Sequence, residues 1–235
     1  MSIAENIARV QERLHSAAQR ANRDPNSIAL MAVSKTFPAK SIHEAYAVGL
    51  RLFGENRVQE FATKFAAVQS LTDARFHMIG HLQSNKTVKA AELFHAIDSV
   101  DSLRLAEKLN ESAAKLKKKL AVLIEINVGG ESSKSGIAPT SPELEGLLTA
   151  VPTLTNLELS GLMTVPPFTD DPEGARPYFR QLRELRDRLA ASNLPNVGLN
   201  ELSMGMSHDF EVAIEEGSTC VRVGTAIFGS RTYAP

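Results

Sequence analysis

The chain has 235 residues, of which 43% are hydrophobic, and its 26 basic and 27 acidic side chains leave a formal net charge of -1. This length suits one α/β barrel, and the balanced charge gives no electrostatic reason to expect nucleic acid or an anionic membrane as the main partner. The single cysteine, Cys220, excludes an intrachain disulfide and any metal cluster built on several thiolates, and it suits a reducing cytosol.

The N-terminus predicts a helix and shows no targeting segment. Ser2 and Glu5 have the spacing of a capping box, and apolar residues recur at helical spacing from Ile3 to Leu14. No apolar run approaches the length of a membrane span. We therefore expect a cytoplasmic protein that has no membrane partner.

After this helix, strand-like apolar runs alternate with helical patterns. Strands are predicted at about 28–35, 52–56, 76–82, 94–100, 121–128, 157–165, 198–206 and 219–228. Helices are predicted at about 38–48, from the end of the second strand to about 69, and at about 84–92, 101–117, 141–150, 173–191 and 208–216.

Regular alternation of strands and helices indicates a parallel sheet. Eight such units in about 200 residues predict a single (β/α)8 barrel of the TIM type with an extra N-terminal helix. Periodicity alone leaves a doubly wound open sheet as the alternative. Because no linker rich in proline, glycine or serine divides the chain, we expect one domain over residues 1–235.

Lys35 closes the first predicted strand, separated from the apolar run 28–33 only by Ser34, and it lies shortly before Pro38. Lysine is rarely buried, so an amine at such a position either reaches solvent or has a chemical role. The end of a core strand is also a place where a lysine can form a Schiff base. The strand end alone does not decide between these interpretations.

Further polar residues lie where the other predicted strands end, which in a (β/α)8 barrel is the active-site face. They are Glu55, Asn56, His81, Gln83, Asn127, Thr164 with its neighbour Met163, and the segments 203–207 and 222–225. Polar residues gather at strand ends in any protein, but that tendency explains only one or two of them.

The segments after strands seven and eight predict a phosphate site, because barrels often bind phosphate between these loops and a short helix. Gly205 and Gly224 predict a close approach of the backbone, and Ser207 and Thr225 supply hydroxyl and N–H groups. Ser207 is also expected to cap the helix that starts near His208. An ordinary cap and a core glycine are the alternative interpretation.

Arg222 alternates with Val221 and Val223, so we expect its side chain to point into the barrel. A buried arginine needs an acceptor, which is either Glu125 on the fifth strand or an atom of a ligand.

Pyridoxal 5′-phosphate (PLP), a phosphorylated aldehyde with a ring nitrogen, satisfies all three features. Lys35 then forms the Schiff base, the last two loops hold the phosphate, and Arg222 donates a hydrogen bond to the pyridine nitrogen. Because arginine stays protonated, it does not protonate the ring, and an unprotonated pyridine is a weak electron sink. This arrangement restrains carbanion chemistry.

Seven stretches resemble, in the same order, those of the pyridoxal phosphate homeostasis protein family. They are Ala32–Thr36, Phe53–Asn56 with Val58–Glu60, Ile79–Lys86, Ser133–Gly136, Gly161–Met163, Leu202–Ser207 and Arg222–Gly229. Two residues depart from the family pattern. Arg57 stands where the family usually has tyrosine, and His208 stands where it usually has aspartate.

The resemblance implies a barrel similar to the N-terminal domain of alanine racemase, with PLP as its cofactor. It implies a Schiff base on Lys35, phosphate contacts from Met206, Ser207, Gly224 and Thr225, Arg222 at the pyridine nitrogen, and Asn56 and Met163 around the ring.

The resemblance also implies a function in PLP homeostasis, as a carrier or regulator of vitamin B6 pools that passes PLP to apo forms of PLP-dependent enzymes. We expect no turnover of its own, because the chain after strand eight leaves no room for the second domain of a racemase, and we expect a monomer. The alternatives are a one-domain amino-acid racemase that uses Lys35 and His81 as bases, and a Schiff-base aldolase acting on a sugar phosphate through Lys35.

Four minor features have ordinary explanations. His77 and His81 lack obvious carboxylate or thiol partners, so we expect core or loop histidines and no metal site. Cys220 is expected to be a small buried residue. The lysines at 115 and 117–119 are expected to end a solvated helix. Lys134 is expected to be a solvated loop lysine, and a transient Schiff base with free PLP is its alternative.

Overall fold

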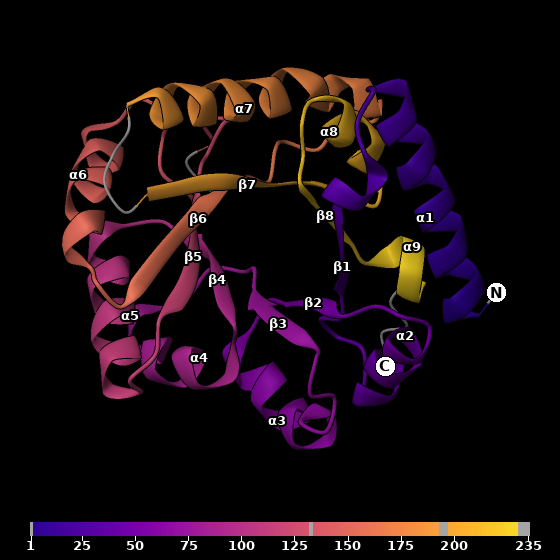
Figure 1. Cartoon of the computed structure of the whole chain (residues 1–235), viewed down its shortest axis with the longest axis horizontal. Helices are drawn as coiled ribbons and strands as arrows, with labels where there is room; N and C mark the ends of the chain where they lie inside the picture. Colours follow the sequence, from indigo (N-terminus) through magenta and orange to yellow (C-terminus); the bar gives the residue numbers. More distant parts are fainter. Residues whose placement is uncertain (1, 132–133, 193–196, 230–235) are drawn as a thin grey trace.

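The computed structural model describes residues 2–131, 134–192 and 197–229. Eight parallel strands pair in chain order and close into a barrel, which Figure 1 shows encircled by helices. The strands are β1 (Ala29–Val33), β2 (Leu52–Glu55), β3 (Arg75–Met78), β4 (Ala96–Val100), β5 (Leu120–Glu125), β6 (Leu157–Met163), β7 (Val197–Met206) and β8 (Cys220–Val223). The predicted (β/α)8 barrel is confirmed, and the open sheet is excluded.

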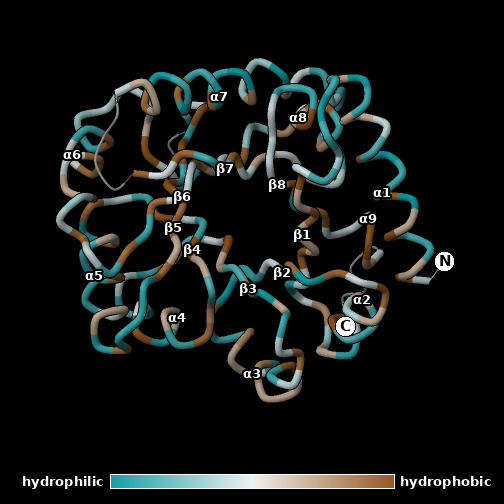
Figure 2. The backbone as a smooth tube through the Cα atoms, in the orientation of Figure 1, coloured by the Kyte–Doolittle hydropathy of each residue, from teal (hydrophilic) through white to brown (hydrophobic). Residues whose placement is uncertain are grey.

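The helices follow the strands around the outside of the barrel. They are α1 (Ile3–Arg20), α2 (Ala39–Ala47), α3 (Val58–Val68), α4 (Thr87–Leu93), α5 (Leu103–Lys115), α6 (Pro142–Ala150), α7 (Arg176–Ala191), α8 (Phe210–Glu215) and α9 (Thr225–Phe228). Short 3-10 turns lie at Pro25–Ser27, Ser84–Lys86, Val151–Thr153 and Pro172–Ala175. Figure 2 shows hydrophilic residues along outer helices such as α7 and hydrophobic residues on strands such as β1 and β5.

The predicted N-terminal capping box is present in α1. The Ser2 hydroxyl accepts from the Glu5 backbone N–H at 3.2 Å, and the Ser2 N–H donates to the Glu5 carboxylate at 2.8 Å. The buried face of this helix packs on α8 and α9, which lie beside it in Figure 1. It therefore supports the last βα unit from outside.

Phenylalanines fill the layer between the strands and α3. Phe61 of α3 packs at a tilt against Phe76 of β3 and Phe94, with ring centroids 4.7 and 4.9 Å apart, and Phe76 stacks on Phe53 of β2. Buried rings of this size contribute strongly to stability. They hold α3 firmly against the first strands.

Several predicted strand ends are wrong because apolar residues continue into the loops. β3 ends at Met78 and not at 82, and β8 ends at Val223 and not at 228. Residues 225–228, of which the last three are apolar, form α9, whose Ile227 is fully buried. Short apolar runs suit helices as well as strands. The helix predicted at 101–117 ends at Lys115, which leaves Leu116 exposed and not on the apolar face.

Within the described part of the chain, none of the helices has the length and hydrophobicity needed to cross a bilayer.

Candidate functional site at the carboxyl end of the barrel

All eight predicted site residues lie at or just beyond the carboxyl ends of strands β1, β2, β6, β7 and β8. Strand pairing brings the two key elements together, because β1 and β8 are neighbours and Met31 pairs with Arg222. Met206 of β7 pairs with Arg222 from the other side. The predicted lysine, arginine and phosphate loops thus share one end of the barrel.

Lys35 lies in a tight turn after β1 and not within the strand, which ends at Val33. The Phe37 N–H donates to the Ser34 carbonyl at 3.1 Å and closes the turn. Thr36 has a φ of 67°, a left-handed conformation that is rare for a β-branched residue. Ser34 is fully buried, while the Lys35 side chain is half-buried.

Arg222 is 4% exposed and lies within the barrel, as the alternation of β8 predicts. Its guanidinium donates to the Ser203 hydroxyl at 2.8 Å and to the Thr164 carbonyl at 2.7 Å. The alternative in which Glu125 is its acceptor is therefore wrong, although Glu125 lies close enough to act on it through charge. Burial lowers the pKa of Arg222, but a guanidinium stays protonated in a protein.

Glu125, the last residue of β5, carries a buried carboxylate oxygen without a hydrogen-bond partner among the described residues, Oε2. The pKa of Glu125 is raised to about 7, mainly by burial and also by the charge of Asp101, while Arg222 and His81 oppose the shift. Buried polar atoms are almost always paired, so an unpaired one indicates a place for a ligand or a water. The sequence pointed to Glu125 only as one of two alternative acceptors for Arg222, and it gave no sign of an unpaired oxygen.

Ser207 joins the last two βα units. Its hydroxyl accepts from the backbone N–H groups of Gly224 at 3.2 Å and of Ala226 at 3.4 Å. The prediction that Ser207 caps α8 is wrong, because that helix begins at Phe210 with Asp209 as its N-cap residue. Ser207 instead holds the start of α9 against the end of β7.

The two glycines of the predicted phosphate loops have different roles. Gly205 has a φ of 92°, and a Cβ there would lie 2.5 Å from the Ala213 Cβ, so this glycine accommodates α8 and not a ligand. A Cβ on Gly224 would make only ordinary contact with Val33, at 3.5 Å. Thr225, the first residue of α9, is exposed. Of the predicted phosphate groups, the structure brings Ser207 and Gly224 into direct contact.

The remaining predicted residues surround the same end of the barrel. Met163 ends β6, is fully buried and pairs in register with Glu125. Asn56 follows β2 and is half-buried. A Cβ on Gly80 would lie 2.6 Å from the Asn56 carbonyl, so this glycine lets the loop after β3 pass close to Asn56.

Both histidines have carboxylate partners, contrary to the prediction. His77 Nδ1 lies 3.1 Å from Asp98 Oδ1, and His81 Nδ1 lies 3.0 Å from Asp101 Oδ2. These aspartates come from β4 and the loop after it, so only strand pairing reveals them. In residues 2–131, 134–192 and 197–229, no group of three or more His, Cys, Asp or Glu side chains could hold a metal ion. Cys220 is buried as predicted, and burial raises its pKa to about 12.

The other lysines are less solvated than predicted. Lys118 is half-buried and donates to the Phe94 carbonyl at 3.2 Å, so the basic run is not simply a solvated helix end. Lys134 donates to the Pro166 carbonyl at 3.2 Å and pairs with Glu131 at the same distance. Ser133, part of one motif, lies outside the described residues.

The two departures from the family pattern lie on loops near the site. Arg57 is exposed and occupies the N-cap position of α3. His208 Nε2 lies 3.2 Å from the Thr169 carbonyl, and its ring packs on Phe168 with centroids 5.5 Å apart. His208 thereby connects the loop after β7 to the loop after β6.

Lys64 on α3 is the residue that sequence reasoning missed. Its side chain is only 10% exposed, and its ammonium lies 2.9 Å from both Glu55 and Glu60. The one signal in the sequence was the four-residue spacing between Glu60 and Lys64, which ordinarily marks a surface pair.

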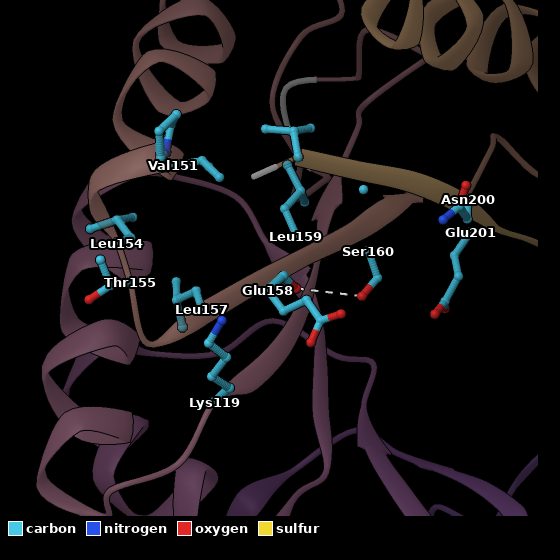
Figure 3. A pocket seen from close by; sticks show the side chains of 13 residues that line it. Lys119, Val151, Leu154, Thr155, Leu157, Glu158, Leu159, Ser160, Asn200 and Glu201 are labelled. Atoms are coloured by element: carbon cyan, nitrogen blue, oxygen red, sulfur yellow. Dashed lines mark hydrogen bonds between the residues drawn. The ribbon is translucent and has the colours of Figure 1, made fainter. Parts of the chain in front are cut away.

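A hollow of about 630 Å³ lies far from these residues, where β6 and β7 begin. Figure 3 shows Lys119, Glu158, Ser160 and Glu201 around it. None of the eight predicted site residues lines this hollow. Its position at the amino ends of the strands is not where barrels carry their active sites.

Comparison with known proteins agrees with this geometry. Residues 2–232 match the family described as "Alanine racemase, N-terminal domain". A pyridoxal phosphate homeostasis protein of Aquifex aeolicus is 48% identical over 233 residues, which are 99% of this chain and 100% of the relative. One of Escherichia coli strain K12 is 44% identical, over 99% of this chain and 98% of that relative.

Solved structures are similar as well. PipY of Synechococcus elongatus, with PLP bound, is 38% identical with a TM-score of 0.84 and covers 97% of this chain and 100% of its own. An alanine racemase of Clostridium difficile is 16% identical with a TM-score of 0.74. It covers 99% of this chain and 57% of its own, and it shows the fold alone.

Proposed function

Because the chain belongs to the family of pyridoxal phosphate homeostasis proteins, we propose that it binds PLP at the carboxyl end of its barrel, as a Schiff base on Lys35. The observation that carries this proposal is the burial of two ionisable groups, Arg222 and Glu125, inside an apolar barrel. The Arg222 guanidinium donates to Ser203, and Glu125 Oε2 has no hydrogen-bond partner among the described residues. An unpaired buried oxygen indicates a place for a polar group of a ligand, and PLP carries a ring nitrogen and oxygen substituents.

Each predicted site residue has a role in this proposal. Lys35 supplies the amine, and Arg222 donates to the pyridine nitrogen. The phosphate is held by the segment that Ser207 ties to α9, which contains Met206, Ser207, Gly224 and Thr225. Asn56 and Met163 line the ring.

Bound PLP supplies a reactive aldehyde and an electron-withdrawing ring. Arg222, which remains a hydrogen-bond donor, keeps the ring nitrogen unprotonated and the ring a weak electron sink. The chain therefore holds and protects the cofactor, and it does not activate the cofactor for turnover. We propose a carrier or regulator of vitamin B6 pools, acting as a one-domain monomer in the cytoplasm and supplying apo forms of PLP-dependent enzymes.

The experiment that tests this proposal is borohydride reduction of the PLP-loaded protein followed by peptide mapping. We expect a pyridoxyl adduct on Lys35 and no visible Schiff-base absorption in Lys35→Ala. Lys40→Ala, which removes an exposed lysine from the next helix, is the matched control and should keep the band. A Lys35→Ala protein with the full band contradicts the proposal.

A one-domain amino-acid racemase is the second candidate, favoured by the His81–Asp101 pair at the same end of the barrel. A carboxylate that orients an imidazole is a common arrangement for a general base. Incubation of the PLP-loaded protein with an L-amino acid in deuterated water separates the two functions. The carrier proposal predicts no α-deuterium and no racemic product, whereas rapid incorporation of deuterium supports the racemase.

A further inference from the structure

Lys64 binds two carboxylates under the loop that carries Lys35. Its ammonium lies 2.9 and 3.0 Å from the two carboxylate oxygens of Glu55 and 2.9 Å from Glu60 Oε1. Glu55 ends β2 and is fully buried, while Glu60 lies in the first turn of α3. The three side chains, called here the Lys64 cluster, join the end of β2 to the start of α3.

The same ammonium holds both ends of the turn that contains Lys35. It donates to the carbonyls of Ser34 and Phe37, each at 3.2 Å. An ammonium has three N–H bonds, so it shares them among five acceptor atoms. Lys64 therefore fixes the backbone on both sides of Lys35.

The two carboxylates hold the rest of the turn. The Ser34 hydroxyl donates to Glu55 Oε1 at 2.7 Å, and the Thr36 N–H donates to Glu60 Oε1 at 2.6 Å. Ser34, Thr36 and Phe37, which flank Lys35, are thus all bonded to the Lys64 cluster. The left-handed conformation of Thr36 persists only where surroundings over-determine it, and this cluster supplies that constraint.

Packing alone does not require a buried cation here. Burying an ammonium and a carboxylate costs desolvation, and apolar side chains of similar volume often serve stability as well. The neighbouring phenylalanine layer already attaches α3 to the strands. The cluster instead orients the turn around Lys35, because its hydrogen bonds go to the backbone of that turn.

We propose that Lys64, with Glu55 and Glu60, is a positioning residue that presents the Lys35 amine to the aldehyde of PLP. The inference rests on the proposed Schiff base at Lys35 and names the part of the scaffold that orients it. An amine that is held in the reactive orientation forms the Schiff base faster and binds PLP more tightly. A misplacement of about 1 Å can lower the rate of a reaction a hundredfold.

The main test is the double variant Glu55→Gln/Lys64→Met, which replaces the ion pair by neutral groups of similar volume. PLP is titrated into the apoprotein, and the affinity, the rate at which the Schiff-base band appears and the pH midpoint of that band are measured. We expect PLP binding about tenfold weaker, slower appearance of the band and a displaced midpoint. Lys108→Met, which breaks the exposed pair with Glu111, is the matched control and should leave all three unchanged.

A milder pair of variants keeps the test decisive if the double variant does not fold. Glu60→Gln retains an oxygen that accepts from the Thr36 N–H, so its midpoint should match the wild type. Glu60→Leu removes that acceptor and should displace the midpoint. Urea unfolding of each apoprotein confirms that the variants are folded.

The role of Lys64 and the Schiff base on Lys35 would be contradicted by different results. Folded cluster variants with wild-type affinity, rate and midpoint overturn the role of Lys64, provided that Lys35→Ala still abolishes the band. A band that survives in Lys35→Ala overturns the proposed function itself, whatever the cluster variants show.

Discussion

Two buried glutamates end strands at the same end of this barrel, and they differ in their hydrogen-bond partners. Glu55 at the end of β2 is fully buried and receives hydrogen bonds from Lys64 and Ser34. Glu125 at the end of β5 is 8% exposed, and its Oε2 has no partner in the described part of the chain.

The difference in partners distinguishes a glutamate that stabilises the scaffold from one that faces the site. A carboxylate with a cation and a hydroxyl holds neighbouring elements in place, as Glu55 does for the Lys35 turn. Burial raises the pKa of both carboxyl groups, so what distinguishes them is the hydrogen bonding. A buried carboxylate oxygen that lacks a partner is unfavourable in the apoprotein, and it gains from a ligand that supplies one. The first glutamate therefore shapes the binding site, and the second faces it.

The largest expected effect is that of Glu55→Leu. This change leaves the buried Lys64 ammonium with Glu60 as its one carboxylate partner among the described residues, and breaking a buried pair in this way costs about 3–5 kcal/mol of unfolding free energy. Urea denaturation of the apoprotein measures the loss. Glu111→Leu, from an exposed pair, is the control and should change stability by less than about 1 kcal/mol. Equal losses in both variants would remove the distinction between scaffold and surface carboxylates.

Glu125→Gln is expected to stabilise the apoprotein at alkaline pH. The pKa of Glu125 rises from 4.5 to about 7 on folding, so between these values the native state binds more protons than the unfolded state, and stability falls as pH rises. The variant removes this dependence. Its stability relative to the wild type should grow by about 3 kcal/mol from pH 4.5 to above pH 7. Urea unfolding across this range provides the test, and a constant difference would place Glu125 in a solvated setting.

Ser207→Ala is expected to have a smaller effect on unfolding free energy, and it changes the proposed ligand site instead of the scaffold. The variant leaves the N–H groups of Gly224 and Ala226 without their acceptor, which costs about 1–2 kcal/mol. If this segment holds phosphate, PLP should bind less tightly to the variant while pyridoxal, which lacks the phosphate, binds as to the wild type. Equal weakening of both ligands would remove Ser207 from the phosphate site.

The smallest expected effect is that of Thr36→Gly. Glycine adopts the left-handed conformation without strain, but it loses more freedom on folding, so unfolding free energy should stay within about 1 kcal/mol of the wild type. The backbone bond to Glu60 remains, so PLP affinity should be retained. A loss above about 2 kcal/mol in urea unfolding would show that the threonine side chain, and not the cluster, holds the turn.

Local pattern predicted much of this architecture. Periodicity of apolar residues predicted eight strands in the right order, because side-chain alternation and helical spacing are properties of neighbouring residues. The same alternation predicted that Arg222 points inward. Strand ends were predicted too late where apolar residues such as Ile227 continue beyond the barrel, since a short apolar run does not distinguish strand from helix.

The sequence by itself therefore determined the order of the strands, the capping box of α1 and the end of the barrel at which the polar residues gather. Tertiary structure alone decided which of these residues are paired. Lys64 meets Ser34 across 30 positions of sequence, and Glu125 lacks a partner for Oε2 among the described residues once the barrel has closed. Partners distant along the chain are chosen by strand register and helix packing, which depend on the whole barrel. That is why Lys35 was recognisable from its motif, whereas the cluster that holds its turn was not.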